Sequence, residues 1–218
     1  MKFFQILAVC VFLSLLPGTG VKAALIQDVE VQWASSEFTS DWTFLAEFIV
    51  NGEGLTGSEH ALANLVNRIS NSWLTKPDDT DWRIIFDLGA VYDLSLLHIW
   101  NFNYSGATGS GAQDVGILTS VDLAGWSAPW DVVFEEAPGS AGYEGFTIDA
   151  SGLAPARYIQ FDIASNFGTQ FLGQNGYNLV GLSEVQFYGT PVPEPSSLLL
   201  LGAGLAGVAL AGRARRRF

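Results

Sequence analysis

Short runs of alternating hydrophobic and polar residues fill the middle of the chain. In residues 83–89, RIIFDLG, every second residue from Ile84 to Leu88 is apolar, which is typical of a half-buried strand. Residues 59–69 instead have apolar residues at helical spacing and predict a helix. Many short strands beside one helix predict an all-β sandwich or barrel. The segments predicted as strands are residues 83–89, 94–104, 115–121, 130–135, 143–148, 156–163 and 182–188.

The first 24 residues have a different pattern. Lys2 precedes an apolar run that ends at Pro17, and Val21 and Ala23 then occupy the −3 and −1 places of a cleavage site. The run is short for a membrane span, so residues 1–24 are predicted to be a secretory signal peptide. The alternative is a first strand or buried helix of the domain. The only cysteine, Cys10, lies in this segment, so the processed protein would contain no thiol for disulfides, metal sites or catalysis.

The C-terminal residues also differ from the middle. Residues 190–195 are proline-rich and predict a stiff linker, because proline suits neither a central strand nor a helix interior. Residues 196–212 form an uncharged apolar run, which would span about 25 Å as a helix. Residues 213–218 form a basic end that should stay in the cytoplasm, placing the preceding domain outside. Its basic residues are Arg213, Arg215, Arg216 and Arg217.

This arrangement closely resembles the PEP-CTERM sorting signal. The sequence Pro193-Glu194-Pro195 is followed by a single predicted transmembrane helix and a basic terminus. The resemblance implies that an exosortase, a membrane transpeptidase, recognises the motif, and that the host makes exopolysaccharide. We therefore expect the chain to be anchored in the inner membrane and then sorted to the cell surface or extracellular matrix. A plain tail anchor is the alternative.

Charge is divided unevenly along the chain. All of the 22 acidic residues except Glu194 lie in residues 25–189, whereas most of the ten basic residues lie in the two terminal segments. The resulting negative field repels phosphate backbones and makes nucleic-acid binding very unfavourable. Divalent cations and neutral ligands suit this charge better.

Residues 25–189 contain five telling segments, in order ASSEF, AEFIVNGEGL, DWRIIFDLG, ARYIQFDIASN and GLSEVQFYG. In order and spacing they resemble the discoidin family, also called coagulation-factor type C. The resemblance implies one jelly-roll β-sandwich domain of the galactose-binding-like kind, which many carbohydrate-binding modules share. Two departures concern ligand identity: Asn51-Gly52 stands where the family usually has Asp-Gly, and residues 56–81 form a long insertion.

The same resemblance implies a structural calcium ion. In many family members the ion lies between the early Asp-Gly loop and the glutamate of the closing motif. The matching residues here are Asn51, Glu53 and Glu184. Calcium needs six to eight oxygen ligands, which carboxylates, amides, backbone carbonyls and water can supply. The alternative is an ordinary turn beside an edge-strand glutamate.

Sugar binding requires aromatic rings that stack on the apolar faces of sugars, with polar groups at the rim. In the family, loops at one end of the sandwich supply these groups, and residues 165–178 form a loop rich in Gly, Asn and Gln. Trp82 and Trp100 are assigned to the core instead. Asn101 and Asn103 are predicted to satisfy backbone groups. The candidate ligand-binding residues are Trp42 with Phe44, Trp73, Phe171, Gln174, Asn175 and Tyr177.

The sequence argues against catalysis. The two histidines have no metal-ligand spacing, and no GxSxG motif is present. Acidic clusters at residues 78–81 and at Glu135-Glu136 could serve a glycosidase, but adjacent acids more often mark a solvated loop. We therefore expect a non-catalytic protein that binds carbohydrate, with exopolysaccharide as the expected ligand. A structural matrix protein without a defined ligand and a glycan hydrolase are the two alternatives.

Overall fold

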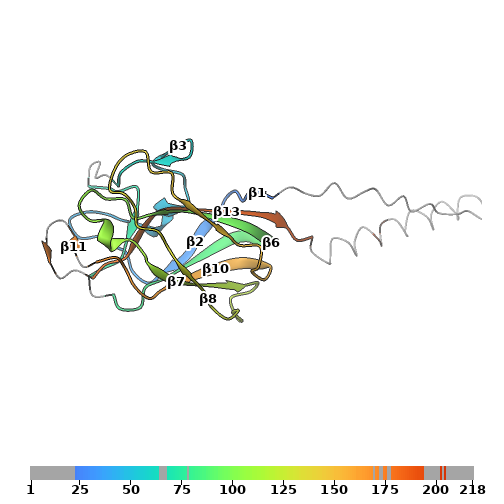
Figure 1. Cartoon of the computed structure of the whole chain (residues 1–218). Coiled ribbons are helices and arrows are strands. Elements are labelled where there is room, and N and C mark those ends of the chain that lie inside the picture. The colour runs from blue at the N-terminus through green and yellow to red at the C-terminus, as the bar shows by residue number, and fades with distance from the viewer. Residues whose placement is uncertain are drawn as a thin grey trace, which may run out of the picture.

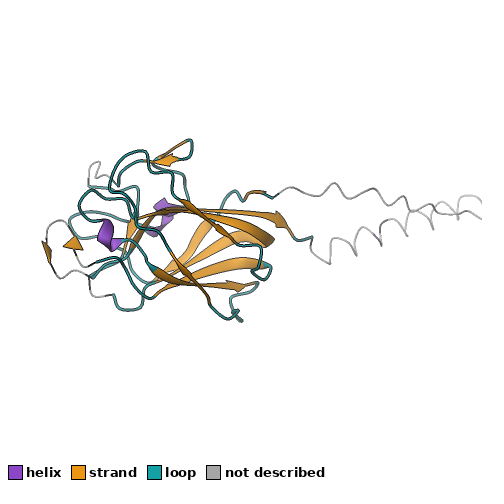
Figure 2. Cartoon of the chain, in the orientation of Figure 1, coloured by secondary structure: helices purple, strands orange, loops and turns teal. Residues whose placement is uncertain are grey.

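The computed structural model describes residues 23–63, 68–77, 79–168 and 178–193, the backbone of residues 170–171 and 174–175, and residues 202 and 204. The strands pair antiparallel and stack in layers, as Figures 1 and 2 show. The longer strands are β2 (Glu30–Ala34), β6 (Arg83–Asn101), β7 (Asp114–Ser120), β8 (Trp130–Val133), β9 (Phe146–Asp149), β10 (Ala156–Ile163) and β13 (Gly181–Pro191). The short elements are β1 (Ala24–Leu25), η1 (Ala46–Ile49), β3 (Leu55–Thr56), β4 (Glu59–His60), β5 (Trp73–Leu74), η2 (Thr108–Ser110), β11 (Gln170–Phe171) and β12 (Gln174–Asn175).

Strand β6 belongs to both layers of the sandwich. Its first half pairs with β2 and β10, and its second half pairs with β9 and β13. Gly89 has a φ of +78° where the chain passes from one layer to the other, a conformation that favours glycine. The main core lies between the layers, where the ring of Phe86 lies 5.1 Å from the rings of Phe161 and Phe187, centroid to centroid.

Most of the predicted strands correspond to observed ones, although their bounds differ. The segments predicted as two strands, residues 83–89 and 94–104, form the single strand β6, which ends at Asn101. Strand β9 begins at Phe146, later than the predicted segment 143–148, and β2 lies outside the predicted segments. Residues 156–163 form β10 over the predicted range. The prediction of all-β structure is confirmed for the described residues. Trp82 and Trp100 are buried in the core, as the sequence predicted.

The helix predicted over residues 59–69 is wrong. Glu59 and His60 form strand β4, which pairs with β3, and residues 61–63 have no regular structure. Arg68 has a φ of +70°, and Ile69 is 48% exposed and forms an isolated bridge with Thr43. Residues 64–67 lie outside the described part of the chain.

The sandwich has two different ends. At the end that we call the tail end, β1 lies beside β13, and the N–H of Val192 donates a 2.8 Å hydrogen bond to the carbonyl of Val91. At the opposite end, the loop end, the connections between strands gather (Figure 1). Strand β13 and the described residues that follow it thus end on the side away from the loops. The loop end consists of residues 35–45, 50–82, 102–113, 134–145 and 164–180.

Candidate functional site

A second, smaller hydrophobic cluster underlies the loop end. Phe44, Phe102 and Leu179 are fully buried there, and Trp42 packs against them with a half-buried side chain. The loops are therefore anchored on a core of their own. Trp42 retains enough exposure to contact a ligand, whereas Phe44 does not.

Trp73 is a correction to the predicted ligand-binding set. Its side chain is fully buried, and its Nε1–H donates a 2.9 Å hydrogen bond to the carbonyl of Ser36. Strand β5 places Trp73 beside β13. The backbone carbonyl of Trp73 lies so close to Gly181 that a Cβ atom at position 181 would approach it to 2.4 Å. A ring enclosed in this way cannot stack on a sugar. Trp73 therefore belongs to the core.

The loop between β10 and β13 contains the other predicted residues. Phe171 in β11 pairs with Gln174 in β12, and Asn175 pairs with Gln170, so these residues form a two-stranded ribbon. The side chains of Phe171, Gln174 and Asn175, and the whole of Tyr177, lie outside the described part of the chain. The base of the loop is fixed, because the side-chain amide of Asn166 donates to Asn178 Oδ1 at 3.0 Å and to the carbonyl of Leu179 at 2.8 Å.

Asn101 and Asn103 have the structural role that the sequence predicted. Both are completely buried at the loop end. The Asn101 amide donates to the carbonyls of Ala112 and Glu135, and that of Asn103 donates to the carbonyl of Ser140. The two amides thus tie neighbouring loops together and do not face a ligand.

The pocket predicted to hold calcium lies at the start of β2, beside β13. Glu184 is 1% exposed, and its Oε1 accepts a 3.1 Å hydrogen bond from the N–H of Gly52. Its Oε2 is buried without a hydrogen-bond partner among the described residues. Burial raises the pKa of Glu184 to about 8, although the Gly52 N–H acts in the opposite direction. A buried carboxylate oxygen that lacks a partner is the kind of group that a bound cation would satisfy.

Other oxygen-bearing residues line the same pocket of about 160 Å³. Asn51 lines it, and so does Asp28, whose φ of +57° places it in a tight turn before β2. Glu53 does not line this pocket; its N–H instead donates to Asn51 Oδ1 at 2.7 Å and closes the turn. The donor set of carboxylates, amides and carbonyls fits a hard cation such as calcium. Sequence reasoning missed Asp28, which lies outside the matched motifs.

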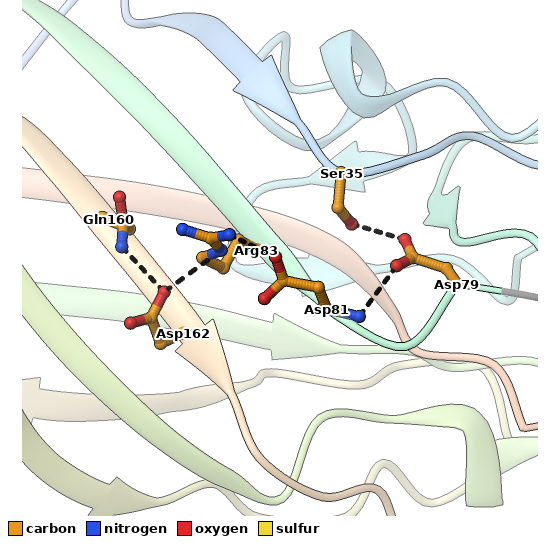
Figure 3. A network of polar contacts seen from close by, with 6 residues as sticks. All are labelled: Ser35, Asp79, Asp81, Arg83, Gln160 and Asp162. Atoms are coloured by element: carbon orange, nitrogen blue, oxygen red, sulfur yellow. Dashed lines mark hydrogen bonds and ion pairs between the residues drawn. The ribbon is translucent and has the colours of Figure 1, made fainter.

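The acidic clusters considered for hydrolysis have structural partners. Asp79 accepts hydrogen bonds from the hydroxyls of Ser35 and Ser36, and Asp81 binds the guanidinium of Arg83 (Figure 3). Glu136 accepts a 2.8 Å hydrogen bond from Thr108 Oγ1. Asp78 lies outside the described residues. Each described contact fixes a loop, which favours the solvated-loop interpretation over catalysis.

Comparison with solved structures shows which class of domains shares this fold. The CBM32-3 module of a family 31 glycoside hydrolase from Clostridium perfringens is 19% identical to this chain, with a TM-score of 0.54. The match covers 77% of this chain and 95% of that chain. The CBM32-5 module of another Clostridium perfringens protein, solved with GalNAc-β-1,3-galactose, is 15% identical, with a TM-score of 0.53. This match covers 75% of this chain and 99% of that chain. An F5/8 type C domain from Bacteroides fragilis is 14% identical, with a TM-score of 0.54, and the match covers 78% of this chain and 97% of that chain. The chain therefore has the β-sandwich fold of CBM32 and F5/8 type C domains.

The C-terminal segment identifies the chain further, as one with a sorting signal. Residues 191–217 match the PEP-CTERM protein-sorting motif, which confirms the sequence-based interpretation and implies export with exosortase-mediated sorting. No curated protein matches the chain in sequence. Within the described residues, no helix has the length and apolar character needed to cross a membrane. The span predicted at residues 196–212 lies outside them, apart from residues 202 and 204.

Proposed function

We propose that this chain is a non-catalytic glycan-binding protein that PEP-CTERM sorting delivers to the cell surface or extracellular matrix. The observation that carries the proposal is the combination of a CBM32-like sandwich with a sorting motif on one chain. The CBM32-5 module that matches this fold was solved with a disaccharide bound. The polar and aromatic residues of the loop end supply the chemistry that sugars require.

The orientation of the domain supports this function. Strand β13 ends at Pro191 on the tail end, where the matched sorting segment begins, away from the loops (Figure 1). An exosortase-type enzyme would recognise Pro193-Glu194-Pro195 while residues 196–212 hold the chain in the inner membrane. The loop end then faces outward, where exopolysaccharide is its expected partner.

We propose further that a structural calcium ion binds between Glu184, Asp28 and Asn51. The unpartnered Glu184 oxygen, and the oxygen atoms of Asp28 and Asn51 in the lining of the same pocket, support this assignment. The Gly52 turn belongs to the same segment as β3 and β4, so a cation there would stabilise part of the loop end.

The function is tested by measuring binding of the purified chain to a glycan array, with calcium and with chelator. We expect binding to a limited set of neutral glycans that weakens in chelator, because the cation orders the loops. A folded sample that binds no glycan would indicate a structural matrix protein instead. Release of shorter sugars from a bound glycan would indicate a hydrolase.

Sorting is tested separately by changing the motif. We expect Glu194→Ala to leave the protein in the membrane fraction of the producing cells, because the exosortase would no longer recognise the tail. Ser197→Ala, which lies just beyond the motif, is the matched control and should be sorted normally. Fractionation and detection of the exported domain measure the difference. Retention of the unchanged protein, Ser197→Ala and Glu194→Ala alike in the membrane fraction would identify the C-terminus as a plain tail anchor.

A further inference from the structure

The outer face of strands β2, β6 and β10 carries an exposed aromatic ring. Alternation along β6 places Ile84 and Phe86 in the core and leaves Arg83 and Ile85 on the outer face. Trp33 in β2 lies opposite Ile85 and is 45% exposed, although tryptophan is among the most buried side chains on average. The ring is therefore available on a flat sheet surface.

Charged and polar side chains surround this ring in fixed positions. The guanidinium carbon of Arg83 lies 5.9 Å from the centroid of the Trp33 ring, at the range of a cation–π contact. Arg83 also binds Asp81 and lies 3.9 Å from Asp162. Gln160 donates a 2.7 Å hydrogen bond to Asp162 Oδ1, which completes a row across β6 and β10 (Figure 3).

A second set of contacts holds the edge of this face in place. Ser35 and Ser36, which follow β2, both donate to Asp79 Oδ2, and the N–H of Asp81 donates to Asp79 Oδ1 at 3.0 Å. Burial acts to raise the pKa of Asp79, but the hydrogen bonds from Ser35, Ser36 and the Asp81 N–H and the charge of Arg83 together lower it, so the pKa lies below its usual value. The loop before β6 is thus tied to the end of β2. Such preorganisation lowers the entropic cost of binding.

Two pockets lie beside Trp33 and Arg83. One, of about 550 Å³, is lined by Trp33 together with Glu37, Glu47 and Lys76. The other, of about 410 Å³, is lined by Arg83 together with the carboxylates of Asp81 and Asp162 and the side chain of Asn178. The two pockets share no lining residue, but Trp33 lines one and Arg83 the other, and these two side chains contact each other.

We infer that the outer face of β2, β6 and β10 is a second glycan-binding surface, separate from the loop-end site. Trp33 stacks on the apolar face of a sugar ring, and the guanidinium of Arg83 with the carboxylates of Asp81 and Asp162 binds its hydroxyls. An apolar ring with a few fixed donors and acceptors beside it is the arrangement that sugars need. The ligand class is that of the proposed function, but this surface requires no loop-end site.

The surface is continuous with the loop end. Asn178 lines the Arg83 pocket and accepts the hydrogen bond from Asn166 at the base of the β10–β13 loop. A polysaccharide chain long enough to reach from the loops to Trp33 would engage both surfaces. Simultaneous engagement raises the apparent affinity without further contacts. We therefore expect long glycans to bind more tightly than disaccharides.

The experiment measures array binding of the full chain, kept in a detergent without a sugar headgroup. The array carries neutral hexose oligosaccharides, including GalNAc-β-1,3-galactose. We expect Trp33→Ala and Arg83→Gln each to weaken binding about tenfold, the loss that one stacked ring or charged donor produces. Trp126→Ala changes a half-buried tryptophan in the loop after β7, at the tail end, and should bind like the unchanged protein. Trp33→Leu, which keeps apolar volume on β2, should bind as weakly as Trp33→Ala.

A loop-end variant, Gln174→Ala with Asn175→Ala, separates this inference from the proposed function. Normal binding by the Trp33 and Arg83 variants overturns the second surface, and if the loop variant then fails to bind, the loop-end site stands alone. Weak binding by the Trp33 and Arg83 variants, at unchanged thermal stability, supports the surface whatever the loop variant does. An unchanged protein that binds nothing on the array overturns both.

Discussion

Without a cation, the folded domain should become less stable as pH rises from about 5 to about 8, and Glu184→Gln should remove that trend. The pKa of Glu184 is about 8 in the folded chain, above its ordinary value of 4.5. Between these values the folded state holds a proton that the unfolded state has released, so stability falls as pH rises. The slope is up to about 1.4 kcal/mol per pH unit, and the total is of the order of 5 kcal/mol.

His60 must be separated from this effect because it acts in the opposite direction. It is fully buried, and burial lowers its pKa below 6.5, so its contribution to stability is lost as pH falls below that value. His60 is unchanged in both proteins, so the difference between wild type and Glu184→Gln isolates Glu184. Denaturant unfolding at a series of pH values in chelator measures it. Parallel curves for the two proteins would contradict the buried, protonated state of Glu184.

Calcium should offset part of this loss of stability in wild type alone. The ion needs the ionised carboxylate, so binding competes with the proton and is stronger at pH 8 than at pH 5. Calcium at a hundredfold excess over its dissociation constant would add about 2.7 kcal/mol, and raise the unfolding temperature by roughly 5 to 11 °C. Thermal unfolding with calcium and with chelator tests this at both pH values. Equal unfolding temperatures at pH 8 would rule out the proposed ion.

The strands could be predicted because their pattern is local, whereas the loop end could not. Residues 156–163 alternate strictly enough to define β10. The apolar residues of 59–69 follow a helical period, yet His60 pairs with Leu55 and Tyr143 and Ala63 packs into the second cluster. Contacts with distant segments override local periodicity here. Trp73, in a segment that looks like a surface loop, is buried in the main core because β5 pairs with β13.

The two candidate sites differ in how far the sequence reveals them. Asn51 and Glu184 are far apart in the chain, so only the resemblance to a family brought them together. The exposure of Trp33 could not be recognised from the sequence, because simple alternation along the strand would place Val31 and Trp33 together in the core. A register shift between these residues pairs Val31 with Phe86 but Trp33 with Ile85, and so turns the ring outward. A bulge of this kind re-aims a side chain and cannot be recognised from periodicity alone.

Replacing Asn101 should cost the domain most of its stability. Its amide is fully buried and makes four hydrogen bonds: it donates to the carbonyls of Ala112 and Glu135 at 2.7 and 2.8 Å, and accepts from the N–H groups of Phe102 and Ala112 at 2.9 Å. Asn101→Ala leaves these backbone groups unpaired, at a cost of about 1 to 3 kcal/mol each. We expect a loss of at least about 4 kcal/mol, against a typical total of roughly 5 to 15 kcal/mol.

Asn101→Asp tests the cause of that loss, because it keeps the shape and replaces the donor with an oxygen. That oxygen faces two carbonyls, so the variant should be more stable when the new carboxyl is protonated than when it is ionised, and should weaken as pH rises. Asn166→Ala removes an amide that also donates two hydrogen bonds but is only half-buried, and should cost about 1 kcal/mol. Denaturant unfolding compares all three. A loss for Asn101→Ala no larger than that for Asn166→Ala would show that water enters the loop end and satisfies the exposed backbone groups.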